Sequence, residues 1–127
     1  KTKAFIHRVR SLHFHINSPF FDLYRLQGEM IIFCEKHVIP AKICNRLQIM
    51  AEEVLQMQPD HTNVLLELSY SEKEDSLLMQ CTAAGKPVNP LEQADNEIHS
   101  TMLKALCESV EYSYRDSKNQ LQLWVRR

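Results

Sequence analysis

Residues 64–70, VLLELSY, and residues 77–81, LLMQC, are joined by the polar segment SEKEDS at residues 71–76. In both apolar segments every second residue is hydrophobic and most of the residues between are polar, which is typical of strands buried on one face only. A short polar connection between two such segments predicts a β-hairpin, so the two strands should be antiparallel.

Three further segments alternate in the same way and predict three more strands, at residues 12–16, 110–114 and 121–125. The last two are separated by the turn-forming residues 116–119, DSKN, which predict a second hairpin. A sheet of five strands is therefore expected.

Helical periodicity appears at about residues 19–37, 41–57 and 94–109. The second segment shows it best, because its apolar residues fall on one stripe: Ile43, Leu47, Met50, Val54 and Met57. Ser18 before Pro19 is a plausible N-cap, and Pro40 separates the first two helices and can open the second.

The expected order of elements is β-α-α-β-β-α-β-β. Strands that are apolar on one face and helices with one apolar stripe must cover each other, which predicts an α+β two-layer sandwich with a mainly antiparallel sheet and helices on one face. The second face of the sheet is then left open. A chain of 127 residues fits one such core.

Composition excludes several classes of function. Formal net charge is −1 at pH 7, which leaves no global field to attract nucleic acid. The longest apolar run, residues 30–34, is far short of the ~20 residues of a membrane-spanning helix. The four cysteines form no C-x-x-C pair, so we interpret them as reduced core residues of a cytoplasmic protein.

Glu52 and Gln56 are the first candidates for chemistry. They lie four residues apart on the second helix, opposite its apolar stripe, so their polar ends point the same way. Such a pair can hold a metal-bound phosphate and activate a hydroxyl. The alternative is a solvated helix face, which almost every surface helix has.

Two other features have a chemical and a structural interpretation. His13 and His15 emerge on the same face of a strand and could chelate a metal, but no third ligand is evident, so we expect exposed strand residues and no metal site. Residues 82–90, with Gly85, could cradle a phosphate, but one glycine favours a plain loop between strand and helix.

A family resemblance rests on residues 50–56 (MAEEVLQ), 83–90 (AAGKPVNP) and 110–121 (VEYSYRDSKNQL). With the order of elements, they resemble the anti-sigma-factor branch of the histidine-kinase-like (GHKL) ATPases, from about residue 12 onward. In that family a helix carries E-x-x-x-N, with Glu as base and Asn on Mg²⁺. The matching positions are Glu52 and Gln56, so the acid is kept and the Mg²⁺ ligand is changed.

The other nucleotide motifs of that family are also altered here. Its adenine-binding motif, D-x-G-x-P-[hydrophobic]-D-P, aligns with residues 83–90, where Gly85 keeps the turn but Ala83 replaces the Asp. The lid segment, residues 96–100, contains no glycine, and a lid without glycine cannot wrap phosphates with its backbone N–H groups. The resemblance thus implies a vestigial pocket at Glu52, Gln56 and Gly85, without a catalytic residue or cofactor of its own.

Residues 1–10, KTKAFIHRVR, resemble the closing helix of ATP-binding subunits of polar amino-acid ABC transporters. This second resemblance implies that residues 1–11 end a preceding ATPase domain or form a linker helix, and that residues 12–127 form the degenerate domain. ATP and Mg²⁺ would then belong to the parent ATPase domain.

Both resemblances favour a non-catalytic regulatory or dimerisation domain at the C-terminus of a transport ATPase. Its partners would be the parent ATPase domain, the membrane subunits of the transporter and, because transporter ATPases work in pairs, a second copy of the chain. We expect no nucleic acid and no direct membrane insertion, only a peripheral place at the inner face of the cell membrane.

The open sheet face is the surface on which we expect a contact: His13, His15, Leu65, Leu78, Gln80, Gln122 and Trp124. These residues could also be the scattered exposed apolar and polar residues of any protein. Two other functions remain open. One is an active anti-sigma-type ATP-binding serine kinase that uses Glu52, and the other is a sensor that holds a small metabolite beside Glu52, Gln56 and Gly85.

Overall fold

The computed structural model of the chain describes residues 10–16, 19–58 and 63–127. The predicted order of elements is confirmed. The elements are β1 (Arg10–Ile16), α2 (Pro19–Lys36), α3 (Ala41–Gln56), β2 (Val64–Ser71), β3 (Ser76–Ala84), α4 (Glu97–Leu106), β4 (Ser109–Arg115) and β5 (Lys118–Arg126). Two short 3₁₀ turns, Pro90–Glu92 and Ala94–Asn96, precede α4.

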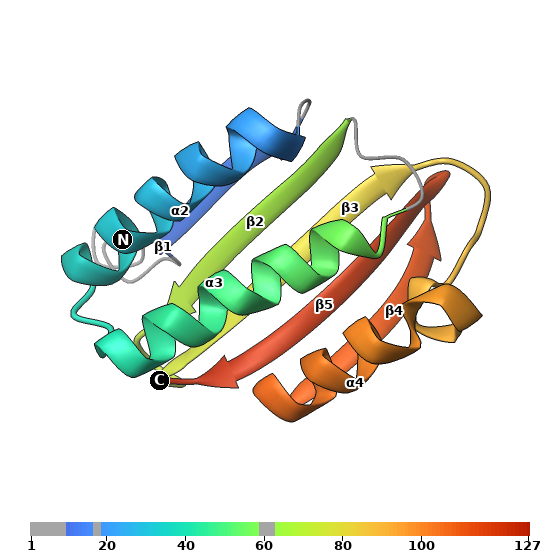
Figure 1. Ribbon diagram of the computed structural model, residues 1–127. Helices are drawn as coiled ribbons and strands as arrows, with labels where there is room; N and C mark the ends of the chain where they lie inside the picture. Colours follow the sequence, from blue (N-terminus) through green and yellow to red (C-terminus); the bar gives the residue numbers. More distant parts are fainter. Residues whose placement is uncertain (1–9, 17–18, 59–62) are drawn as a thin grey trace.

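The five strands form one antiparallel sheet in the order β1-β2-β3-β5-β4, so that β3 is the central strand (Figure 1). Both predicted hairpins are present, β2–β3 and β4–β5. The other two pairings, β1 with β2 and β3 with β5, join strands that lie far apart in the sequence.

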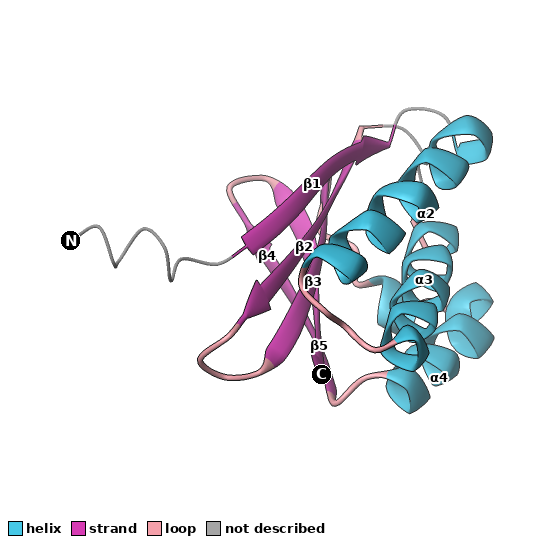
Figure 2. Ribbon diagram, turned by 90° about the vertical axis from the view of Figure 1, so that its left-hand side faces the viewer, coloured by secondary structure: helices cyan, strands magenta, loops and turns pink. Residues whose placement is uncertain are grey.

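All three helices lie on one side of the sheet, and no described element covers the other side (Figure 2). Helix α3 crosses the middle of the sheet between α2 and α4 (Figure 1). Burial alternates along β2 and β3 as the sequence predicts. The predicted α+β two-layer sandwich is therefore confirmed.

The core lies between the sheet and α3, whose apolar stripe meets the inward side chains of the central strands. Leu47 and Val54 of α3 are fully buried, as are Leu77 and Met79 of β3 and Leu123 of β5. Burying such side chains contributes about 1.5–3 kcal/mol each relative to leaving them in water. This central layer fixes α3 on the sheet.

Some boundaries differ from the prediction. Helix α4 spans residues 97–106 and not 94–109, because residues 94–96 form a 3₁₀ turn and Cys107 is extended. The Glu108 amide then donates to the Trp124 carbonyl at 2.7 Å, which starts the pairing of β4 with β5. Strand β1 begins at Arg10, two residues before the expected start.

Tyr114, expected on the inner face of its strand, is exposed, because β4 is an edge strand and its last residues extend past the helical layer. The predicted cap at Ser18 lies outside the described residues. Among the helices of the described ranges, none combines the length and the apolar content that crossing a bilayer requires.

Candidate functional site

Glu52 lies on the side of α3 that faces α2. Its carboxylate Oε2 accepts a hydrogen bond from the Gln27 side-chain amide of α2 at 3.1 Å, and the residue is half-buried. Gln56, one turn further along α3, is exposed on the outer surface of the helical layer. The carboxylate of the predicted pair is therefore used in a contact between two helices.

The neighbouring Glu53 faces the opposite way, toward α4. Its Oε1 lies 2.6 Å from Nδ1 of His99, and both side chains are mostly buried. This contact joins α3 and α4 directly. Sequence alone does not indicate this pair, because Glu53 and His99 lie 46 residues apart and meet only when α3 and α4 pack side by side.

The segment compared with a lid is bound to the end of α3. The Asn96 side-chain amide donates to the Met57 carbonyl at 3.2 Å and to the Pro90 carbonyl at 3.0 Å. Asn96 thus connects the C-terminus of α3 with the 3₁₀ turns before α4. Because Asn96 bonds to both of these carbonyls, residues 96–100 are packed as part of the helical layer.

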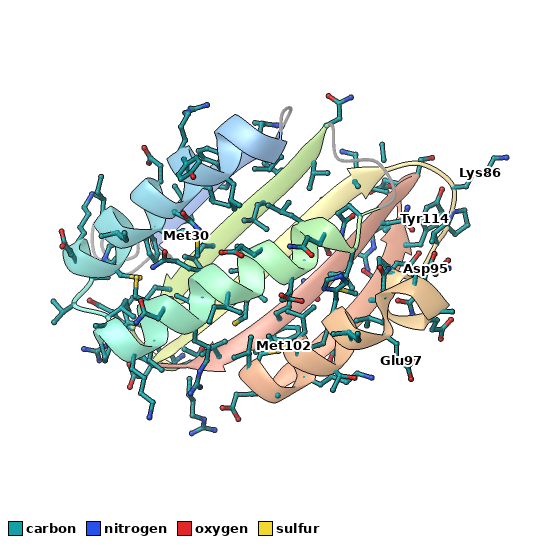
Figure 3. All side chains as sticks on the ribbon, in the orientation of Figure 1. Met30, Lys86, Asp95, Glu97, Met102 and Tyr114 are labelled. Atoms are coloured by element: carbon teal, nitrogen blue, oxygen red, sulfur yellow. The ribbon has the colours of Figure 1, made fainter. Side chains whose placement is uncertain are left out.

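Gly85 follows β3 and has a φ of 146°, a backbone conformation that only glycine adopts without strain. Its carbonyl accepts a hydrogen bond from the Tyr114 hydroxyl at 2.8 Å, and its amide donates to the Ser117 carbonyl at 3.1 Å. Figure 3 shows Lys86 and Tyr114 at this same end of the molecule. The loop after β3 is therefore fixed to the β4–β5 hairpin.

Asn119 holds the rest of that loop. Its Oδ1 accepts hydrogen bonds from the Val88 amide at 2.8 Å and from the Tyr112 hydroxyl, and its Nδ2 donates to the Lys86 carbonyl at 2.9 Å. Among the described residues, Glu52 bonds to α2, whereas Gly85 bonds to the β4–β5 hairpin. The predicted turn at Gly85 is present, but its partners belong to a hairpin, and those of Glu52 belong to α2.

The open face of the sheet holds all seven residues predicted for it, because they alternate with the buried residues of the same strands. Strand register arranges this face in three rows across the sheet. One row is Ser11, Ser69, Leu78, Trp124 and Ser109; the next is His13, Glu67, Gln80, Gln122 and Glu111; the third is His15, Leu65, Thr82, Gln120 and Ser113.

His13, at the β1 edge of the open face, makes two polar contacts. Nδ1 of His13 lies 2.8 Å from Oε2 of Glu67 on the next strand, and Nε2 lies 3.1 Å from the Ser11 hydroxyl. Both ring nitrogens of His13 therefore have protein partners. Within the described residues, no group of three or more His, Cys, Asp or Glu side chains could hold a metal ion.

Trp124 is the largest side chain on this face and is only partly buried. It lines a shallow depression of about 270 Å³ together with Glu74, Glu108 and Arg126. Partly exposed tryptophan beside charged groups is a common feature of protein contact surfaces.

A search against known protein families finds no match to this chain, and a search of curated proteins finds none either.

Proposed function

We propose that this chain is a non-catalytic association domain that pairs two copies of itself through the open face of the sheet. The observation that carries the proposal is the placement of Leu78, Trp124 and Leu65 on the uncovered face, over the centre of the sheet. Two antiparallel sheets that bury such faces pack about 10 Å apart with their strands nearly aligned.

The rows are suited to a second copy in one orientation. A two-fold axis along the central strand β3 sets β1 over β4 of the partner subunit and β2 over β5 of the partner subunit. Trp124 then lies over the small Ser69 of the partner subunit, and Leu78 meets its own copy on the axis. Large side chains opposite small ones give the dense packing that interface cores need.

Polar residues also come together in the same orientation. His13 lies on the β1 edge and Glu111 on the β4 edge of the same row, so each imidazole comes to lie over Glu111 of the partner subunit. Gln80 lies on the axis, where the two copies of its amide can bond to each other. An interface of this kind is isologous and closes at two subunits.

The contacts of the vestigial pocket support a non-catalytic role. Glu52, the residue at the position of the family's base, bonds to Gln27 of α2, while the neighbouring Glu53 bonds to His99 of α4. A nucleotide bound at Glu52 would have to displace its contact with Gln27. Titration calorimetry with Mg-ATP tests this part: binding in the micromolar range that Glu52→Ala abolishes would favour an active kinase instead.

The biological setting that fits a pairing domain is the ATP-binding subunit of an amino-acid importer, because transport ATPases act as pairs and residues 1–10 resemble the end of such a subunit. The domain would then regulate or stabilise the ATPase pair at the cytoplasmic side of the membrane. Sequencing the residues that precede Lys1 tests this setting, which requires a G-x-x-x-x-G-K-[ST] loop upstream.

Sedimentation velocity of the chain over a range of concentrations tests the pairing itself. Trp124→Asp and Leu78→Asp should each shift the dimer toward monomer by tenfold or more in Kd, since each buries a carboxylate in the interface. Ile98→Asp is the matched control, because Ile98 is 77% exposed on α4, at the helical side of the molecule. Thermal melts of all three variants establish that they fold.

Trp124 also gives an independent signal, because it is the only tryptophan of the chain. Its fluorescence maximum should move to shorter wavelength as the concentration rises and the open face is covered. A monomer at every concentration, or a dimer that Ile98→Asp disrupts and Trp124→Asp does not, would refute pairing through this face.

A further inference from the structure

Cys34 of α2 and Cys44 of α3 lie next to each other across the turn that joins these helices. The Cys44 thiol is close enough to help raise the pKa of the Cys34 thiol, after burial, which is the larger cause. Both are buried, with exposed fractions of 2% for Cys34 and 7% for Cys44. They also line one cavity of about 240 Å³ between the two helices, together with Ile31, Ile39 and Gln48.

We propose that Cys34 and Cys44 are a redox-active pair, which small-molecule disulfides of the glutathione type convert into an intramolecular disulfide that joins α2 to α3. The carrying observation is the position of two thiols on neighbouring helices, where both line one cavity. This inference concerns the helical layer and does not depend on the proposed pairing through the open sheet face.

Cys44 is the thiol placed to attack. It lies in the first turn of α3 and lines the cavity between the two helices. The Gln48 side-chain amide donates to its Sγ at 3.5 Å, and Gln48 lines the same cavity. Cys44 is also the less buried of the two.

Cys34 is placed to resolve the first product. Burial, and then the hydrogen bond to Cys44 and its charge, raise the pKa of the Cys34 thiol. Cys34 therefore keeps its proton while Cys44 reacts, and it lines the same cavity as the thiol whose mixed disulfide it must attack. Pairs in which one thiol attacks and a neighbour resolves are the usual arrangement for thiol–disulfide exchange.

The two steps balance as ordinary exchange reactions. The Cys44 thiolate attacks one sulfur of the small disulfide, forms a mixed disulfide and releases one small thiolate, which takes up the proton that Cys44 lost. Cys34 then loses its proton to solvent and attacks Sγ of Cys44, and the second small thiol leaves. The protein is oxidised by two electrons, and the small disulfide is reduced to two thiols.

The other two cysteines provide internal controls because their surroundings differ. Cys81 lies in the central strand, and burial raises its pKa to about 12. Cys107 donates its S–H to the Leu103 carbonyl at 2.8 Å, and burial followed by the charge of Glu108 raises its pKa to about 11. Neither thiol should react with the small disulfide at the rate of Cys44.

The test uses the folded chain in buffers of oxidised and reduced glutathione, followed by acid quenching, alkylation of free thiols and tryptic peptide mapping. Lys36 and Lys42 lie between the two cysteines, so trypsin separates residues 26–36 from residues 43–46. Oxidation should yield these peptides linked, lighter by two hydrogen atoms than their sum. The melting temperature should rise by several degrees, because the crosslink restricts the unfolded chain.

Variants assign the two roles. Cys34→Ser should stop at a glutathione adduct on residues 43–46, and Cys44→Ser should leave Cys34 free for alkylation. Cys107→Ser should oxidise like the parent chain. Absence of the linked peptide in fully oxidised glutathione, or the same mixture of pairings from folded and urea-unfolded chain, would overturn the proposal.

Discussion

The Arg127 guanidinium donates two hydrogen bonds to the backbone carbonyl of Val38, from Nε at 3.3 Å and from Nη2 at 3.0 Å. Val38 follows α2 with a φ of 56°, the left-handed conformation with which many helices end. The same guanidinium bonds to Asp75 in the β2–β3 turn at 3.1 Å and lies over the Tyr70 ring. One side chain after β5 therefore connects the end of α2 with the β2–β3 hairpin.

Removal of this side chain should loosen both elements. Arg127→Ala is expected to lower the melting temperature by a few degrees, because the Val38 carbonyl loses its guanidinium donors and Asp75 keeps only the Tyr70 hydroxyl as a side-chain donor. Burial and a hydrogen bond to Asp75 raise the pKa of Tyr70, and the charge of Arg127 opposes this rise. In Arg127→Ala the Tyr70 pKa should therefore rise further, as measured by ultraviolet titration of the phenols.

Arg126→Ala serves as the control for Arg127→Ala, since Arg126 is exposed and adjacent. Its melting temperature and tyrosine titration should match those of the parent chain. Equal effects of the two substitutions would mean that only net charge is involved, and would contradict a specific role for Arg127.

Two apolar residues of α3 should differ sharply on truncation. Leu47 is fully buried over the sheet, whereas Ile49 is 39% exposed on the outer side of the same helix. Leu47→Ala should lower the free energy of unfolding by about 3 kcal/mol, because it removes packing and leaves a cavity. Ile49→Ala should cost about 1 kcal/mol or less. Urea denaturation measures both, and similar losses would show that α3 is not seated as described.

Much of the fold follows from sequence periodicity. Apolar residues that repeat every two positions in a strand, or about every 3.6 positions in a helix, indicate which side of the element is buried. Leu66 and Leu68 alternate with Leu65 and Glu67, and the structure buries the first pair and half-exposes the second. The strand order was not predicted, because pairing such as that of β1 with β2 depends on contacts far apart in the sequence.

The candidate site was harder to predict, because the direction of a polar side chain depends on its neighbours in space. Glu52 and Glu53 are adjacent acids with the same local sequence signal, yet one bonds to Gln27 of α2 and the other to His99 of α4. A helical projection separates them by about 100°. It gives no indication of which acid faces which helix until the helices are placed on the sheet.

The β4–β5 hairpin turn offers a stabilising substitution. Asp116 and Ser117 have φ values of 55° and 61°, the pattern of a type I′ turn, which favours glycine at the second position. Ser117→Gly should raise the free energy of unfolding by about 0.5–1 kcal/mol, because serine is strained at positive φ. Ser117→Ala keeps the strain and should not stabilise. A urea midpoint that is unchanged or lower in Ser117→Gly would contradict this assignment of the turn.

The buried thiol of Cys81 should make the chain less stable at alkaline pH. Burial raises the pKa of Cys81 to about 12 from an ordinary 9.0, so the unfolded chain releases this proton at a lower pH than the folded chain does. The contribution is fully present below about pH 9 and is lost as pH rises toward the folded pKa. From about pH 8 to about pH 10 the loss should be about 1 kcal/mol.

Cys81→Ala tests this linkage through the slope of stability against pH. The substitution should lower the free energy of unfolding at every pH, because it leaves a small cavity, but it should also flatten the decline above about pH 9. Cys107→Ala is the comparison, since the Cys107 pKa is raised less, to about 11, and the thiol is only half-buried. Urea denaturation of the three chains at several pH values gives the slopes. Parallel curves for Cys81→Ala and the parent chain would show that the Cys81 thiol ionises alike in the folded and unfolded states.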